Sequence, residues 1–135
     1  MNALTALAQY GQMKQQAAQY ASPHQLILLL FNGAIESLSM ASGAIEQKNI
    51  ELRGKHITRA VSIVNGLRDM LDIDKGGEVA DNLYSLYSYM AKEIFSAGFY
   101  NDPSTLENIR QMLMDIRGSW EKIPIDVHSI SVQQA

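Results

Sequence analysis

The sequence contains no cysteine, only three prolines among 135 residues, and no cluster of basic residues. Without cysteine the chain can form neither a disulfide framework nor a cysteine-ligated metal site, so a reducing compartment is allowed. The formal net charge of -3 argues against a nucleic-acid partner, because no basic excess is present to neutralise phosphates. The scattered Lys and Arg residues also offer no patch for an anionic membrane surface.

Long hydrophobic runs are missing as well. No apolar run approaches the roughly 20 residues that a membrane span needs, and the N-terminus lacks the pattern of a signal peptide. We therefore expect a soluble, cytoplasmic protein without membrane insertion. With 47% hydrophobic and 19% charged residues, the composition is typical of one globular domain with one core.

The three prolines mark the ends of helices. Pro23 and Pro103 lie where helical patterns begin, and Pro124 lies where one stops. No Asn-Gly or Asp-Gly pair joins two alternating apolar runs, so no β-hairpin is indicated. These positions predict an all-α protein.

A capping box opens the first strong helix. Ser22 can cap it, Pro23 takes the first helical position, His24 lies in the first turn, and Gln25 follows three residues after the cap. This motif predicts a helix from Ser22 to about residues 47–49. Its expected core stripe is Ile27, Phe31, Ala34, Leu38, Ala41 and Ile45.

Apolar spacing of three and four residues predicts three further helices, over about 50–73, 78–99 and 103–122. The segment 74–77 is expected to stop the first of these, Val79 is expected to point inward, and Asp102 is expected to cap the last. Helices of this length joined by short loops predict an antiparallel up-down four-helix bundle. We expect one domain over residues 1–124, with a mobile, weakly helical N-terminal segment or lid over 1–20, and a disordered tail over 125–135.

The chain lacks the patterns of known catalytic and metal sites. No Glu-x-x-His pair of a di-iron bundle occurs, and neither an EF-hand loop nor a Gly-x-Ser-x-Gly motif is present. His24, His56 and His128 are isolated from one another in the sequence. We therefore expect a protein that is not an enzyme and that has no catalytic residue, cofactor or metal.

Three of the four expected helices carry a second apolar strip beside the core stripe. The strips comprise Leu26, Leu29, Gly33, Met40 and Ala44; then Leu52, His56, Ile63 and Met70; then Ala80, Tyr84, Ala91 and Phe95. They either widen the contacts between neighbouring helices or line grooves for an apolar peptide. Tyr84, Tyr87 and Tyr89 cannot all point inward, which favours an interface on this helix.

Several motifs together resemble the FliS family of flagellar secretion chaperones. They are Tyr10-Gly11-Gln12, ASPHQLI at 21–27, LFNGA at 30–34, GGEVA at 76–80, Asn82-Leu83, LYSYM at 86–90 and Trp120. The resemblance covers about residues 10–124. It implies a cytoplasmic four-helix bundle that binds the disordered C-terminal region of flagellin, prevents early polymerisation and assists delivery to the flagellar type III export apparatus.

The resemblance, combined with the strips, implies a set of partner-binding residues. They are Tyr10, Leu26, Leu29, Gly33, Met40, Ile63, Met70, Asn82, Tyr84, Tyr89 and Phe95. The N-terminal segment is expected to lie over part of this surface and to move aside on binding. Two positions depart from the family, which usually has aspartate where this chain has Asn32 and Ser88.

Two other functions fit the same features. The grooves could serve a regulatory adaptor that binds an export-gate component, a flagellar regulator or a co-chaperone. They could also bury a second copy of the chain, as in a structural module or a weak homodimer formed without ligand.

Overall fold

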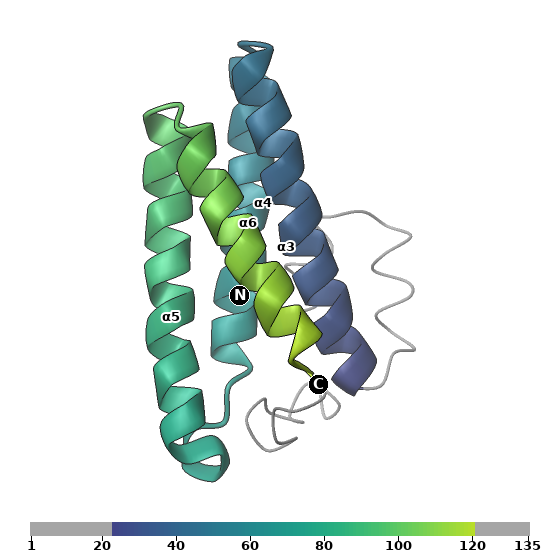
Figure 1. The fold of residues 1–135 in the computed structure, drawn as a ribbon, viewed down its shortest axis with the longest axis vertical. Helices are drawn as coiled ribbons and strands as arrows, with labels where there is room; N and C mark the ends of the chain where they lie inside the picture. Colours follow the sequence, from purple (N-terminus) through teal and green to yellow (C-terminus); the bar gives the residue numbers. More distant parts are fainter. Residues whose placement is uncertain (1–22, 121–135) are drawn as a thin grey trace.

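The computed structural model describes residues 23–120 and shows four helices. They are α3 (Pro23–Glu46), α4 (Ile50–Asp69), α5 (Ile73–Phe99) and α6 (Pro103–Gly118). Successive helices run in opposite directions, and α6 crosses in front of the others from the top of α5 towards the start of α3 (Figure 1). The prediction of an all-α four-helix bundle is confirmed. The expected helical segment within 1–20, the Ser22 cap and the tail over 125–135 lie outside the described residues.

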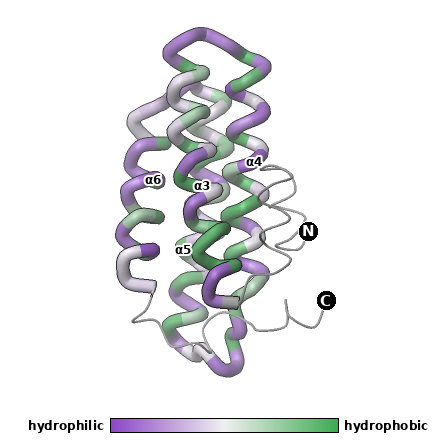
Figure 2. The backbone as a smooth tube through the Cα atoms, turned by 90° about the vertical axis from the view of Figure 1, so that its right-hand side faces the viewer, coloured by the Kyte–Doolittle hydropathy of each residue, from purple (hydrophilic) through white to green (hydrophobic). Residues whose placement is uncertain are grey.

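One hydrophobic core runs through the bundle. Hydrophobic and hydrophilic residues alternate along the helices (Figure 2), as expected where one face of each helix is buried. The largest fully buried side chains come from all four helices. They are Tyr87, Phe31, Ile27, Leu30, Leu38, Ile63, Leu67, Met90, Ile94, Leu106 and Ile109.

The apolar run at the start of α3 is used mainly inside the bundle. Leu26, Ile27, Leu30 and Phe31 are all buried, and Leu29 is partly buried against the same core. The stretch His24–Glu46 is the one described helix that is long and apolar enough to span a membrane, yet half of its most apolar window is buried within the protein. Core packing therefore accounts for its apolar character.

Side-chain caps begin the other three helices. The Oδ1 atom of Asn49 accepts from the backbone N–H of Leu52 at 3.1 Å, and Asp72 Oδ1 accepts from that of Lys75 at 3.1 Å. Asp102 accepts from the backbone N–H of Thr105 at 3.2 Å and from its hydroxyl at 2.6 Å, and these bonds lower the pKa of the Asp102 carboxyl. The cap predicted at Asp102 is confirmed, and each such cap stabilises its helix by about 1 kcal/mol.

The predicted stop at 74–77 is confirmed only in part, because the helical conformation is interrupted at Gly77 but α4 ends earlier than predicted. Helix α4 already ends at Asp69, and α5 begins at Ile73, because the Asp72 cap starts a new helix before the glycine pair. Gly77 has a φ of 57° and a ψ of -133°, which are not helical, so a short helical turn before it is joined to the long helix after it across a kink; a residue lacking Cβ adopts this conformation at little cost. The inward position predicted for Val79 is wrong: directly after the kink it is 45% exposed.

Two helices end on residues in the left-handed region. Lys48 has a φ of 58° and Asn101 a φ of 54°. Each is followed by a backbone N–H that bonds five residues back, Asn49 to the Ala44 carbonyl at 2.9 Å and Asp102 to the Ala97 carbonyl at 2.8 Å. This Schellman geometry usually has glycine at the left-handed position, so lysine there is strained.

Replacing Lys48 with glycine should relieve that strain. We expect Lys48→Gly to raise the free energy of unfolding, measured by urea titration, by about 0.5–1 kcal/mol. Gln47→Gly is the matched control, because Gln47 is the preceding exposed residue and is not among the residues with positive φ. A control that gains as much stability as Lys48→Gly would contradict the explanation.

Candidate partner-binding surface

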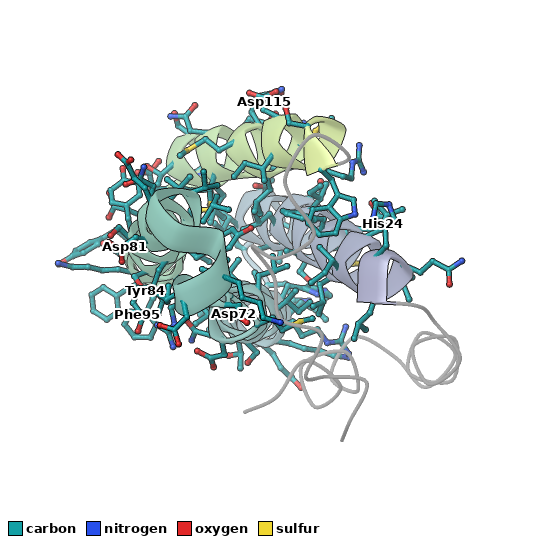
Figure 3. All side chains as sticks on the ribbon, turned by 90° about the horizontal axis from the view of Figure 1, so that it is seen from below. His24, Asp72, Asp81, Tyr84, Phe95 and Asp115 are labelled. Atoms are coloured by element: carbon teal, nitrogen blue, oxygen red, sulfur yellow. The ribbon has the colours of Figure 1, made fainter. Side chains whose placement is uncertain are left out.

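An apolar groove lies between α4 and α5. Its cavity volume is about 370 Å³. We call it the α4–α5 groove and define it by its lining residues Arg53, Gly54, Ile57, Thr58, Val61, Ser62, Phe95, Gly98 and Phe99. Seen from below the bundle, Tyr84 and Phe95 project on the same side of α5 (Figure 3).

Gly98 brings the two helices together at this groove. A Cβ atom on Gly98 would lie 2.7 Å from Cγ1 of Ile57 and 3.1 Å from Cγ2, so only glycine fits beside this β-branched side chain. Gly54, which lines the same groove from α4, has nothing within 4 Å of its corresponding position. The approach of α4 to α5 therefore depends on one glycine and not on the other.

Exposed aromatic residues flank this approach. Phe95 is 66% exposed, Phe99 is 70% exposed, and the adjacent Tyr100 is 73% exposed. The rings of Phe99 and Tyr100 meet edge to face, with centroids 4.9 Å apart. Large apolar side chains gathered on one surface are typical of a protein-binding site.

Tyr84 extends the same edge of α5 towards its N-terminus. It is 44% exposed, and the guanidinium carbon of Arg68 lies 5.5 Å from the centroid of its ring. Arg68 also forms an ion pair with Asp69 at 3.2 Å. Residues 84, 88, 95 and 99 follow helical spacing, so Tyr84, Ser88, Phe95 and Phe99 share this edge.

A second, more polar cavity adjoins the groove at the end of the bundle. It has a volume of about 330 Å³. We call it the end pocket, and it is lined by Ala44, Ile45, Lys48, Asn49, Ile50, Arg53 and Asn101. Arg53 lines both cavities, and its Nη1 atom donates to Oδ1 of Asn101 at 2.5 Å.

The predicted partner-binding residues divide into buried and surface positions. Those on the surface are Met40, Asn82, Tyr84, Tyr89 and Phe95, and Leu29 is partly buried. Those inside the bundle are Leu26, Gly33, Ile63 and Met70. For these four residues, burial agrees with the alternative in which the strips widen the contacts between neighbouring helices. Tyr10 lies outside the described residues, and partner contact stays a prediction for every member of the set.

Sequence reasoning missed several residues of the groove. Phe99, Gly98 and Val61 were assigned to no partner surface, although Phe99 follows Phe95 by four residues and that spacing is visible in the sequence. Gly98 gave no signal, because its importance depends on which residue of α4 lies opposite. Arg53 gave none either, since its place between two cavities depends on tertiary structure.

The two positions at which the resemblance implies an aspartate lie at different surfaces. Asn32 is exposed on α3, and its Oδ1 atom accepts from Nη1 of Arg117 in α6 at 2.7 Å. It therefore connects α3 with α6. Ser88 is partly buried on the edge of α5 that carries Tyr84 and Phe95.

His56 is a buried titratable residue of α4. His56 is only 8% exposed, and its Nδ1 atom has no hydrogen-bond partner among the residues of the described part of the chain. Burial lowers the pKa of His56, and the charges of Arg59 and Lys55 lower it further, while Glu36 acts in the opposite direction. Within residues 23–120, no group of three or more His, Asp or Glu residues could hold a metal ion.

Comparison with known proteins identifies one family. The family model described as flagellar protein FliS matches residues 6–126. Flagellar secretion chaperone FliSB of Pseudomonas aeruginosa is 40% identical over 124 residues, covering 91% of this chain and 98% of the relative. The flagellar secretion chaperones FliS of Salmonella typhimurium and Vibrio cholerae are 39% and 34% identical, each over 84% of this chain and over 86% and 84% of the relative, respectively.

The two groove glycines allow a matched test of the helix approach. We expect Gly98→Ala to lower the free energy of unfolding by about 1–3 kcal/mol, because its methyl group overpacks against Ile57. We expect Gly54→Ala to raise it by up to about 1 kcal/mol, since alanine favours a helix and open space surrounds this site. Urea titration measures both, and changes of the same sign would contradict the proposed contact.

Acidification should destabilise the bundle through His56. The folded state lowers the pKa of His56 from 6.5, so the unfolded chain binds the proton first as the pH falls. Stability is therefore retained above about pH 6.5 and decreases below it, until the folded state also takes up the proton. We measure the midpoint of urea unfolding between pH 7.5 and pH 5.5. We expect this midpoint to fall less with decreasing pH in His56→Leu than in wild type. The control His24→Gln should retain the wild-type decrease, and an unchanged slope in His56→Leu would exclude His56 as the cause.

Proposed function

The chain belongs to the FliS family of flagellar secretion chaperones, and from this premise we propose that it is a cytoplasmic chaperone for flagellin. It binds the disordered C-terminal region of flagellin, keeps the flagellin from polymerising early, and assists its delivery to the flagellar type III export apparatus. The task consists of binding and release, so it needs neither catalysis nor a cofactor.

The α4–α5 groove is the observation that carries the proposal. It combines an apolar lining with Phe95 and Phe99, which remain about two-thirds exposed. A disordered segment that folds onto this surface loses conformational entropy. Burial of apolar area, at about 25 cal/mol per Å², offsets that loss. An exposed aromatic surface of this kind therefore suits a partner that is itself disordered before it binds.

Calorimetry with a C-terminal flagellin segment tests the proposal. We expect binding with a large negative heat-capacity change, the mark of apolar burial. Phe95→Ser should weaken the affinity roughly tenfold or more while changing the melting temperature little, because this side chain is exposed in the free protein. Val79→Ser is the matched control, since Val79 is an exposed apolar residue of α5 that does not line the groove.

Three results would count against the proposal. One is the absence of binding at high micromolar concentrations of the flagellin segment. Another is equal loss of affinity in Phe95→Ser and Val79→Ser, which would remove the groove from the binding site. The third is a pull-down from cell extract that returns another small protein and no flagellin, which would favour the regulatory adaptor.

A further inference from the structure

The apolar α4–α5 groove ends at a positive charge. Among residues 23–120, Arg53 is the one charged residue that lines the groove, and it lies where the groove meets the end pocket. The end pocket adds Lys48, and neither aspartate nor glutamate is among its lining residues. The apolar α4–α5 groove therefore ends at two cationic side chains, Arg53 and Lys48.

The charge of Arg53 is not neutralised by the contacts it makes within residues 23–120. Its guanidinium donates to the Asn101 amide, which is neutral. The ion pairs recorded in this part of the chain join Arg68 with Asp69, and Arg110 with Glu107. The Asn101 contact holds Arg53 in place while leaving its charge available for a ligand.

Helix α4 is also basic within an acidic protein. The chain has a formal net charge of -3, whereas α4 carries four basic residues and two acidic ones. These are Arg53, Lys55, Arg59 and Arg68, against Glu51 and Asp69. The local field along this helix therefore favours a partner with negative charge.

We propose that a carboxylate of the bound segment docks at Arg53 and Lys48, while the apolar side chains of that segment fill the α4–α5 groove. This inference rests on the proposed function and names the chemical pattern of the flagellin segment that occupies this site. The carboxylate belongs either to the C-terminus of the segment or to an aspartate or glutamate side chain. Arginine suits this task because its planar guanidinium can bind both oxygens of a carboxylate.

The length of the groove limits the segment that fits. From Arg53 to Ser62 the groove follows ten residues of α4, whose nine steps of 1.5 Å span about 14 Å. A helix of about ten residues matches this length, with apolar residues three or four apart on one face. The carboxylate lies at the end of that segment nearest Arg53.

The experiment measures binding of the full chain to three synthetic peptides of the C-terminal flagellin segment. The first has a free C-terminal carboxylate, the second has a C-terminal amide, and the third has a free C-terminus but Asn and Gln in place of Asp and Glu. The protein variants are Arg53→Gln, Lys48→Gln and Lys55→Gln. Lys55 is the matched control, because it is an exposed cation of α4 that lines neither cavity.

We expect Arg53→Gln and Lys48→Gln to weaken binding of the first peptide roughly three- to fivefold each, as exposed charge pairs do. Lys55→Gln should change it less. The peptide that lacks the docking carboxylate should bind wild type more weakly than the first peptide, and Arg53→Gln should not weaken its binding further. If this is the second peptide, the carboxylate is the C-terminus; if it is the third, the carboxylate belongs to an Asp or Glu side chain. Raising the salt concentration should reduce the difference between the peptides.

A further variant separates charge from structure. Asn101→Gly keeps the left-handed backbone and the Arg53 charge but removes the hydrogen bond between them. It should retain the preference for the carboxylate. If Asn101→Gly loses that preference while Arg53→Gln keeps it, a direct role for the Arg53 charge is overturned.

The remaining outcomes distinguish the inference from the proposed function. Suppose that the first peptide binds wild type, but that neither the protein variants nor the peptide changes alter the affinity more than Lys55→Gln does. Only the carboxylate inference is then overturned. If the peptide does not bind wild type, the proposed function and the inference both fall. If light scattering shows a dimer that Phe95→Ser and Arg53→Gln dissociate, the occupant is a second copy of the chain, and the inference is overturned.

Discussion

Burial of α3 is the constraint on which the rest of the bundle depends. Its first turns present Leu26, Ile27, Leu30 and Phe31 on more than one side, and all four are buried. A single neighbouring helix cannot cover so wide an apolar surface, so α4 packs on one side and α6 on the other. Helix α5 then closes the bundle against α4, because its own stripe of Tyr87, Met90 and Ile94 must be covered too.

The α4–α5 groove is a consequence of how this closure is made. Gly98 lets Ile57 approach the backbone of α5, because the Ile57 side chain fills the space that a Cβ atom at position 98 would need. Phe95 and Phe99, one turn of helix apart, flank the contact and remain mostly exposed. Close packing at one point thus leaves bulky aromatic rings at the surface, where a partner can bury them without unfolding the core.

The sequence predicted the helices better than it predicted the surface. Caps and apolar spacing are local, so four helices and the Asp102 cap could be recognised in advance. Asp72 caps a helical turn ahead of the predicted stop at 74–77, and the helical conformation is then interrupted at Gly77. Exposure is not local, since a strip beside the core stripe is buried wherever a neighbouring helix covers it. Ile63 and Met70 are covered, whereas Tyr84 and Phe95 are not, and no spacing rule separates these cases.

The Asn32–Arg117 contact joins two helices through a neutral acceptor. The resemblance implies an aspartate at position 32, where the amide Oδ1 atom here accepts from the Arg117 guanidinium at 2.7 Å. The contact still joins α3 to α6, but a neutral acceptor leaves the charge of Arg117 uncompensated by this partner. Because an exposed ion pair contributes only about 0.2–1 kcal/mol, its absence costs the bundle little. With asparagine at position 32, this surface carries one positive charge more than it would with the aspartate that the resemblance implies, and that difference acts on the selection of partners by charge.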